Sequence, residues 1–226
     1  MILNTFNLNT TQVEQFNKYY NFLIEENKKY NLTAITDRKE VYIKHFYDSI
    51  AACFVLDFLQ INSYCDIGSG GGFPVIPLKI VFPHLNLTII EPTRKKIDFL
   101  QKLCELLQLN DIEFVNQRAE DFIGKRRECF DLVSARAVAI LPVLLELAIP
   151  FIKVGGIFIS YKGSNYHEEL KASSNALKTL FSVIDKIYEY QLPENMGQHV
   201  IIKIRKQRKT EITYPRSFAQ IKKKHL

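Results

Sequence analysis

One short stretch of the sequence, "YCDIGSGGGF" (64–73), places an acid, Asp66, directly before a cluster of glycines. An apolar, strand-like run leads into the cluster, and a helix-like run follows it. In a doubly wound sheet, the loop after the first strand lies where ligands bind, and glycines let the backbone turn sharply and approach a ligand closely. The stretch therefore predicts a ligand-binding loop built on Gly68, Gly70 and Gly72.

Three classes of ligand compete for a glycine-rich loop of this kind. A P-loop needs Lys followed by Ser or Thr after its last glycine, and none follows here. A dinucleotide fingerprint wants Gly or Ala where this chain has the bulky Phe73. The pattern D-x-G-x-G-x-G instead resembles motif I of class I S-adenosylmethionine methyltransferases. That cofactor carries a cationic sulfonium and an ammonium, which favour a nearby carboxylate, so Asp66 would act either directly or by ordering the loop.

A second acid lies where such a cofactor would need one. The next strand-like run, 86–91, ends in Glu91, twenty-five residues after Asp66. A carboxylate at that strand end can accept hydrogen bonds from both ribose hydroxyls of a nucleoside. The alternative is an ordinary solvated strand end. A glycine loop together with this acid, inside βαβ units, is a stronger signal than the loop alone.

The elements that would hold these residues alternate along the chain. Strand-like and helix-like runs follow one another from residue 63 onward, which is typical of βαβ units and a parallel sheet covered on both faces. The fold class is therefore α/β, a class I Rossmann-like methyltransferase with a mostly parallel twisted sheet. The expected strands are 63–67, 86–91, 112–115, 130–134 and 156–161, and the expected helices are 75–82, 93–108, 139–151 and 166–181.

Both ends of the chain depart from this alternation. Apolar residues at helical spacing over 10–30 and 36–58 predict that the first sixty residues are helical. Two late strand-like runs, 182–190 and 198–206, predict an antiparallel pair that closes the sheet. We therefore expect an N-terminal helical cap (1–60), a methyltransferase domain (61–206) and a basic C-terminal tail (207–226).

Composition narrows the class of protein. A chain of 226 residues, 47% of them hydrophobic, allows one substantial domain. Its four cysteines are scattered without a CxxC motif, so we expect reduced thiols rather than a metal site or disulfides. No apolar run reaches membrane-spanning length and no signal-peptide start is present, which predicts a cytoplasmic protein that does not associate with membranes. We expect a monomer.

The charge is unevenly placed along the chain. Residues 203–226 hold nine Lys and Arg and one acid, so this segment carries +8 whereas the remainder carries −2 of the total +6. A basic tail on a near-neutral body suggests a polyanionic partner such as RNA. We expect the tail to attract RNA without affecting cofactor binding. The alternatives are a solvated, disordered end, or a tail in which "YPR" (214–216) packs back onto the core.

The motifs taken together resemble one family, ribosomal RNA small subunit methyltransferase G, also called glucose-inhibited division protein B. The resemblance covers nearly the full length in the family's order. It implies adenosylmethionine-dependent methylation of N7 of one guanine in the decoding-region loop of 16S ribosomal RNA, with that RNA or the small ribosomal subunit as partner. The matching segments are "YNLTAI" (30–35), "KHFYDSI" (44–50), "DIGSGGGFPVIPL" (66–78), "RKKIDFL" (94–100), "RAEDF" (118–122), "FDLVSARAVA" (130–139), "KGSNYHEEL" (162–170) and "YPR" (214–216).

The resemblance also implies roles for single residues. It gives Arg136 and Lys162 the catalytic positions, where they would recognise guanine O6 or phosphates. Its cofactor-binding residues, joined to those of the glycine loop, are Asp66, Gly68, Gly70, Gly72, Phe73, Glu91, Ala119, Glu120 and Arg136. Its RNA-facing residues are Asn31, His45, Arg118, Lys162 and Arg216, with the neighbourhood of Ala137. The closing segment "SFAQIKKKHL" departs from the family pattern, since it lacks the Gly and Pro usual there.

The chemistry of the expected reaction agrees with what the sequence omits. Guanine N7 has an accessible lone pair and carries no proton at neutral pH, so methylation needs in-line placement and no base. The sequence has no NPPY-type motif for amino-group methylation. Three rivals remain: a methyltransferase for a small molecule or protein, an RNA-binding nucleotide sensor without turnover, and a nicotinamide-dependent oxidoreductase. The basic tail argues against the first rival, and the full glycine loop with Glu91 argues against the second. Phe73 argues against the third.

Overall fold

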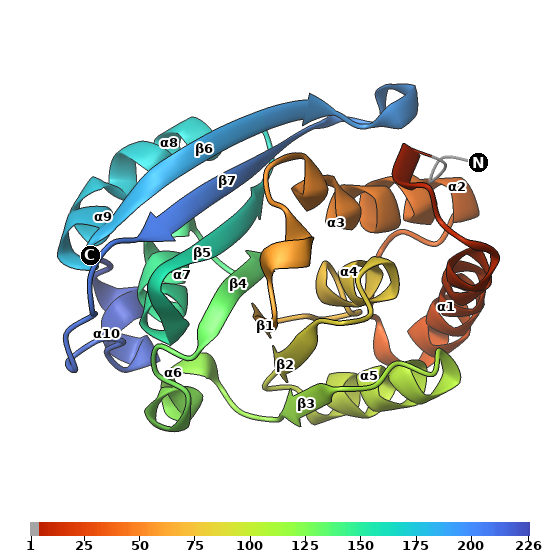
Figure 1. Ribbon diagram of the computed structural model, residues 1–226, viewed down its shortest axis with the longest axis horizontal. Coiled ribbons are helices and arrows are strands. Elements are labelled where there is room, and N and C mark those ends of the chain that lie inside the picture. Colours follow the sequence, from red (N-terminus) through yellow and green to blue (C-terminus); the bar gives the residue numbers. More distant parts are fainter. Residues whose placement is uncertain (1–4) are drawn as a thin grey trace.

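A seven-stranded sheet organises the chain, which is described here for residues 5–226 by a computed structural model (Figure 1). Its strand order is β3-β2-β1-β4-β5-β7-β6. The first five strands in this order pair in parallel, and β7 and β6 then add as antiparallel neighbours. The strands are β1 (Ser63–Ile67), β2 (Asn86–Ile90), β3 (Ile112–Val115), β4 (Phe130–Arg136), β5 (Ile152–Lys162), β6 (Ser182–Gln191) and β7 (Gln198–Lys206).

One face of the sheet is covered by the N-terminal helices together with two crossover helices (Figure 1). These share a single core that is rich in aromatic rings, so the cap is packed as part of the sheet domain. Residues 1–4 of the expected cap lie outside the described residues. The helices are α1 (Thr10–Tyr30), α2 (Arg38–Glu40), the π-helical η2 (Val41–Tyr47), α3 (Asp48–Ile50), the 3₁₀ turns η3 (Ala51–Phe54) and η4 (Phe58–Gln60), α4 (Val75–Val81) and α5 (Arg94–Leu106).

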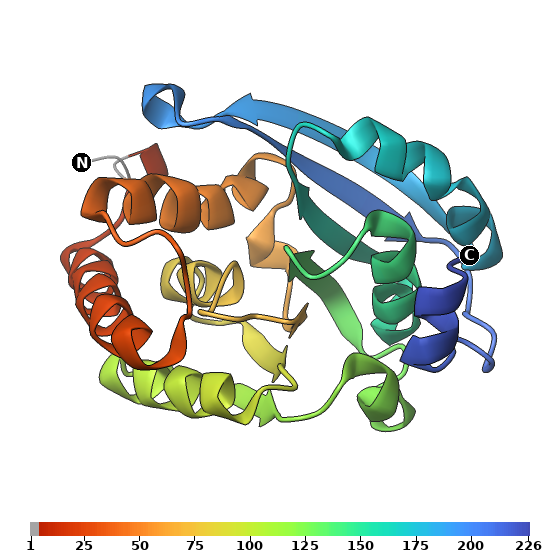
Figure 2. The same ribbon diagram turned by 180° about the vertical axis from the view of Figure 1, so that it is seen from behind.

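The opposite face carries the remaining helices, which Figure 2 shows from behind. Side chains that alternate along the strands with those of the first core, such as Val133 and Ile202, form the second core here. A short turn, η7 (Pro193–Asn195), links β6 and β7. The helices of this face are α6 (Ala119–Phe122), η5 (Ile123–Lys125), α7 (Leu141–Ala148), η6 (Ile149–Phe151), α8 (Tyr166–Ala172), α9 (Ser174–Thr179) and α10 (Phe218–Lys223).

The longest helix, α1, illustrates how local sequence sets its limits. Asn9 accepts a hydrogen bond from the backbone of Gln12, and the Gln12 side chain accepts one from the backbone of Asn9, which forms a capping box. The helix ends at Tyr30, and its C-cap residue Asn31 adopts a left-handed conformation with φ 51°. Between these ends Phe16, Tyr19 and Leu23 recur at helical spacing and are buried.

Most of the expected elements are present, with local differences. The strand expected at 156–161 is longer and runs from Ile152 to Lys162. Its early part was missed because, after the buried Ile152, residues 153–155 are exposed and lack the apolar run that predicts a strand. The helix expected over 166–181 is two helices that meet near Ser173, whose hydroxyl donates to the carbonyl of Glu169. The helix α6 was not expected at all, since four residues are too few to show periodicity.

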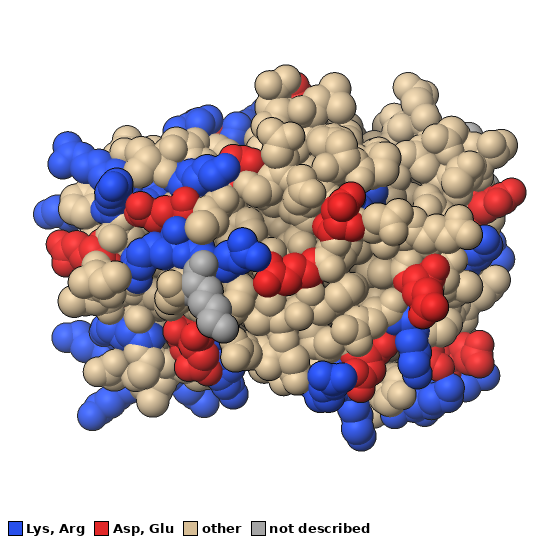
Figure 3. Space-filling model, turned by 60° about the horizontal axis from the view of Figure 1, so that its bottom comes forward, with Lys and Arg blue, Asp and Glu red and all other residues tan. Residues whose placement is uncertain are grey.

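The basic tail is folded back onto the protein, as one of the alternatives for "YPR" required. Ile221 of α10 is fully buried, and Arg216 pairs with Glu146. Four of the nine basic residues counted from residue 203 onward form ion pairs, namely Lys203, Arg205, Lys206 and Arg216. In Figure 3, Lys and Arg gather toward the end of the molecule that carries the tail, with Asp and Glu among them. Within residues 5–226, no helix is long and apolar enough to cross a membrane.

Candidate active site

Two cavities open at the edge of the sheet where the parallel strands end. The smaller, of about 310 Å³, lies against the ends of β1 and β2 and is lined by Gly68 and Glu91. The larger, of about 700 Å³, lies against the ends of β4 and β5 and is lined by Arg136 and Lys162. Both are lined by the loop 137–139, so this loop is the boundary between them. This edge is where open α/β sheets bind ligands.

The glycine loop is shaped by two close approaches. Gly68 has φ +73°, and a Cβ placed on it would lie 2.6 Å from Cγ2 of Val138 in the boundary loop. Gly72 has φ +97°, and a Cβ there would lie 2.6 Å from the hydroxyl oxygen of Tyr19. That hydroxyl donates a 2.5 Å hydrogen bond to the carbonyl of Gly71, so the N-terminal cap holds the loop directly. Only Gly68 of the loop lines the smaller cavity, whereas Gly72 serves close packing.

Asp66 lies beneath the loop and is completely buried. Its carboxylate accepts hydrogen bonds from the hydroxyls of Ser69 and Ser134. Burial raises the pKa of Asp66 to about 7, although both hydrogen bonds and the charge of Arg136 act to lower it. Of the two roles open to this acid, the geometry therefore fits ordering of the loop and not direct contact with a ligand.

Glu91 faces the smaller cavity and is only 3% exposed. Its carboxylate accepts hydrogen bonds from the backbone N–H of Gly70 at 3.1 Å and from that of Thr93 at 2.9 Å. These bonds hold the side chain at the mouth of the glycine loop with acceptor capacity remaining, since a carboxylate has about four lone-pair sites. The two hydroxyls of a ribose could donate hydrogen bonds to this carboxylate at the end of the cavity.

Phe73 occupies the junction between the cap and the larger cavity. Its ring stacks on the rings of Tyr19 and His45, with centroid distances of 5.4 Å and 4.4 Å, and the guanidinium carbon of Arg136 lies 5.0 Å from its centroid. The residue is 6% exposed and lies outside the lining of the smaller cavity. The ring therefore supports His45 and Arg136, and it lies outside the lining of the smaller cavity, whereas the family resemblance implies a contact with the cofactor.

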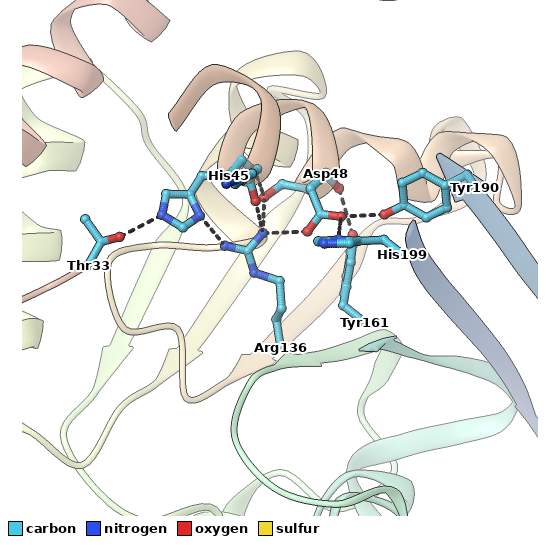
Figure 4. Close-up of polar contacts among 9 residues, drawn as sticks. Thr33, His45, Asp48, Arg136, Tyr161, Tyr190 and His199 are labelled. Carbon is cyan, nitrogen blue, oxygen red and sulfur yellow. Dashed lines mark hydrogen bonds and ion pairs between the residues drawn. The ribbon is translucent and has the colours of Figure 1, made fainter. Parts of the chain in front are cut away.

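Figure 4 shows how His45 and Arg136 are joined. Arg136 can only donate, so its Nη2 donates to Nδ1 of His45 at 3.1 Å, and Nε2 of His45 therefore carries the proton and donates to the hydroxyl of Thr33 at 2.8 Å. Burial and the charge of Arg136 lower the pKa of His45 to about 3. The imidazole is therefore neutral at physiological pH and positions Arg136.

Asp48 is the anion at the centre of this network and is 2% exposed. It accepts hydrogen bonds from Arg136 at 2.8 Å, from the hydroxyl of Tyr190 at 2.5 Å and from Nδ1 of His199 at 2.6 Å (Figure 4). Burial alone would raise the pKa of Asp48, but the hydrogen bond from His199 and the charge of Arg136 outweigh it and hold this pKa below its usual value. Asp48 thus joins the cap to β4, β6 and β7 as a carboxylate.

Lys162 lines the larger cavity from the end of β5. Its Nζ pairs with Glu169 of α8 at 2.6 Å and donates to the carbonyl of Ala139 at 2.8 Å. Glu169 also accepts a hydrogen bond from the backbone of Leu141 at 2.6 Å. Lys162 therefore fixes the boundary loop to α8 and α7, and its charge is partly neutralised in this state.

The other expected site residues divide between the two cavities and the periphery. The smaller cavity is lined by Arg118, Ala119 and Glu120, which is consistent with the expected position of Ala119 and Glu120 near one end of the cofactor. Asn31 forms the C-terminal cap of α1 and does not line either cavity. Arg216 makes a bidentate ion pair with the buried Glu146, so the structure gives this expected RNA contact a structural partner instead.

Several residues of the site were missed by reasoning from sequence. Asp48 follows His45 by three residues in "KHFYDSI", which places both on one helical face, and this spacing could have revealed it. Tyr190 and His199 come from the last two strands, far along the chain, and no local pattern marks them. Ala137, whose neighbourhood was expected to face the RNA, lies in the boundary loop with φ +58°, a backbone conformation that is uncommon for a residue with a side chain and that only the structure reveals.

The sheet order, the glycine loop and the acid at the end of β2 define a class I S-adenosylmethionine-dependent methyltransferase. A family model described as rRNA small subunit methyltransferase G matches residues 12–192. The chain belongs to this family. It is 49% identical over 212 residues to "Ribosomal RNA small subunit methyltransferase G" of Bacillus subtilis, with 92% of this chain and 88% of that protein covered. The protein of the same name from Staphylococcus epidermidis is 50% identical over 210 residues, with the same shares covered.

Solved structures support the fold assignment. An O-methyltransferase from a trans-AT PKS multienzyme of Brevibacillus brevis, solved in complex with S-adenosyl-L-homocysteine, superposes with a TM-score of 0.54. The match covers 73% of this chain and 72% of that one at 14% sequence identity. At such low identity the likeness concerns the fold alone, and it confirms the class I architecture predicted from the sequence.

Proposed function

We propose that this enzyme transfers the methyl group of S-adenosylmethionine to N7 of a guanine in the decoding-region loop of 16S ribosomal RNA. The family description and the names of the relatives support a small-subunit ribosomal RNA substrate. The cavity with Glu91 would hold the cofactor, and the cavity with Arg136 would receive the guanine. We further propose that the protein works as a cytoplasmic monomer.

The observation that carries the choice of N7 is that the candidate bases of the larger cavity are already engaged. Asp48 accepts three hydrogen bonds, and Glu169 accepts from Leu141 and Lys162. His45 uses both ring nitrogens, and its pKa of about 3 makes it a poor proton acceptor. A lone pair such as that of N7 needs no base, only a fixed approach to the methyl group.

The chain's own residues would then bind and orient the reactants. Glu91 would accept hydrogen bonds from the ribose, and Gly68 would leave room for the cofactor beside the boundary loop. The cofactor supplies an electrophilic methyl group on a sulfonium. Arg136, held by Asp48 and His45, would donate to O6 of the guanine, the usual partner of an Arg fork.

The direct test is to incubate the protein with labelled S-adenosylmethionine and, separately, naked 16S ribosomal RNA, intact small subunits and large subunits. Nucleoside digestion and mass spectrometry then identify the product, and the labelled position is mapped by sequencing. We expect 7-methylguanosine at one position of the small-subunit RNA only. Label in a methylated amino group, or in large-subunit RNA, contradicts the proposal.

One nitrogen, Nε2 of His199, remains as a conceivable base, because Nδ1 of this ring donates to Asp48. His199→Asn removes Nε2 and keeps a donor at the position of Nδ1. If N7 is the acceptor, single-turnover methylation should fall by less than about tenfold in this variant. A loss of about a hundredfold or more, in the range of general-base catalysis, would instead indicate proton removal by His199 and a different target atom.

A further inference from the structure

The C-terminal tail forms part of the wall of the cofactor cavity. Phe218, the first residue of α10, lines this cavity together with Ala119 and Glu120 of α6 and Leu147 of α7. Phe218 lies more than a hundred residues beyond Glu91, which lines the same cavity from the end of β2. The family model ends at residue 192, well before this segment.

The position of Phe218 is fixed on both sides in the chain. Before it, Arg216 donates to Glu146 from its backbone N–H at 3.0 Å, from Nε at 2.7 Å and from Nη2 at 2.6 Å. Glu146 is completely buried in α7, next to the cavity residue Leu147. After it, Ile221 is fully buried in the core on the same side of the sheet. Residues 214–226, which we term the C-terminal clasp, are thus held at two points with Phe218 between them.

A third contact links Phe218 to the cofactor side. The guanidinium of Arg118 lies 5.1 Å from the centroid of the Phe218 ring. Arg118 is the N-terminal cap residue of α6, and Ala119 and Glu120 follow it directly. The ring is therefore positioned against the start of α6 by a cation–π contact, and Arg118 is engaged within the protein.

The chemistry of the cavity differs from one part of its lining to another. Glu91 supplies a carboxylate that suits ribose hydroxyls, whereas Ala119, Leu147 and Phe218 supply apolar surface. A purine base is flat and aromatic, and stacking on an aromatic side chain is a common way to bind it. We infer that Phe218 is a cofactor-binding residue that contacts the nucleoside end of S-adenosylmethionine, and that docking of the C-terminal clasp and cofactor binding support each other.

This inference rests on S-adenosylmethionine being the ligand of the smaller cavity, and it is independent of the RNA substrate. The first test is therefore calorimetric titration with S-adenosylhomocysteine and S-adenosylmethionine in the absence of RNA. Phe218→Ala should weaken binding of both ligands about 5- to 30-fold, within the range measured for base–aromatic stacking. Phe218→Leu, which keeps apolar volume, should lose less than Phe218→Ala.

Two control variants define the scale of this effect. Glu91→Ala should weaken both ligands about 10- to 150-fold, because a hydrogen bond to a charged acceptor contributes about 1.5–3 kcal/mol. The triple variant Lys222→Gln, Lys223→Gln, Lys224→Gln removes three exposed charges of the clasp and leaves Phe218 and the Arg216–Glu146 pair in place. Its ligand affinity should match that of the unaltered protein.

The second test uses the reciprocity of coupled binding. If the cofactor and the clasp stabilise each other, each must favour the other by the same factor. S-adenosylhomocysteine should therefore slow trypsin cleavage after Lys222–Lys224 by the factor by which the docked clasp raises the affinity for this ligand. Arg216→Ala, which unpairs Glu146, should accelerate this cleavage and also weaken ligand binding. Arg216→Ala and Phe218→Ala are both assayed at a temperature where circular dichroism shows a folded protein.

The outcomes separate this inference from the proposed function. If the unaltered protein binds neither ligand, the proposed function fails. If it binds them, but Phe218→Ala binds equally well and the ligand leaves tail cleavage unchanged, then Phe218 only packs over α7 and the inference is wrong. Weaker binding in Phe218→Ala, together with protection of the tail by the ligand, supports it.

Discussion

The two ends of the chain reach the active site in different ways. The N-terminal helices are fused to the sheet through buried rings, among them Phe16, Tyr19, Phe46 and Phe73, and they bring His45 and Asp48 to the larger cavity. The C-terminal clasp is attached chiefly through the Arg216–Glu146 ion pair, the buried side chain of Ile221 and the cation–π contact of Phe218 with Arg118, and it brings Phe218 to the smaller cavity. Because many buried rings join the cap to the sheet, the cap should unfold only together with the sheet. The clasp makes fewer contacts, so its docking can change when a ligand binds.

The largest effect should come from opening the core of the cap. Phe46 is fully buried and packs against the rings of Phe16, Tyr19 and Tyr42. Phe46→Ala should lower the free energy of unfolding by about 3–5 kcal/mol, because it removes a large side chain and leaves a cavity. Chemical denaturation followed by circular dichroism measures this loss.

A matched change in the clasp sharpens the comparison. Phe218→Ala, at a partly exposed ring, should lower the free energy of unfolding by much less than Phe46→Ala while weakening cofactor binding more. Equal losses of stability in the two variants would show that the clasp is as much a part of the core as the cap.

The next effect concerns the residue that the cap positions. Arg136 donates from Nη1 to Asp48 and from Nη2 to His45, and one ammonium cannot reproduce that fork. Arg136→Lys should reduce turnover about 10- to 100-fold, equivalent to about 1.4–2.7 kcal/mol, with a smaller proportional change in melting temperature. Single-turnover methylation and thermal unfolding measure the two quantities. Full activity in the Lys variant would mean that Arg136 contributes charge alone.

A separate effect should appear as a pH dependence of stability. The pKa of Asp66 is raised by burial to about 7, so the folded state keeps a proton that the unfolded state loses near pH 4. The stability contributed by the protonated form is fully present below about pH 4 and is lost as pH rises through about 7, by up to about 1.4 kcal/mol per pH unit. His45 has the opposite sign, because its lowered pKa makes stability fall as pH drops below about 6.5.

Asp66→Asn isolates the contribution of Asp66. The difference in unfolding free energy between the unaltered protein and this variant should change with pH between about 4 and 7 and level off above that range. Taking the difference removes His45 and the surface carboxylates, which both proteins share. A difference that stays constant from pH 4 to pH 8 would show that Asp66 is ionised throughout.

The smallest effect should come from the exposed charges of the clasp. Replacing Lys222, Lys223 and Lys224 by Gln should flatten the slope of log RNA affinity against log salt by about 2 units if all three neutralise phosphates, at about 0.7 per contact for single strands. Filter binding over a series of salt concentrations measures the slope. An unchanged slope, together with unchanged cofactor affinity, would place the RNA on other surfaces of the protein.

Much of this architecture could be predicted from the sequence. Three features depend on local periodicity or on backbone conformations that few residues allow: the glycine loop, the acid at Glu91 and the alternation of strand and helix. Short segments of sequence are therefore enough to predict them. The same holds for the helical cap and the closing antiparallel pair. The family motifs then gave the reaction class, which the family model and the relatives confirm.

Tertiary structure alone decided what those residues do. Four residues that were expected to contact ligands are each held by a partner that is distant in sequence or lies in another element. The pairs are Phe73 with His45, Arg118 with Phe218, Lys162 with Glu169, and Arg216 with Glu146. Such pairings depend on which faces of separate elements meet, and no short stretch of sequence encodes that. The types and spacing of residues determined the class of cofactor and the class of fold. Long-range packing determined that Asp48 joins the cap to the last strands, and that the tail forms a wall of the smaller cavity.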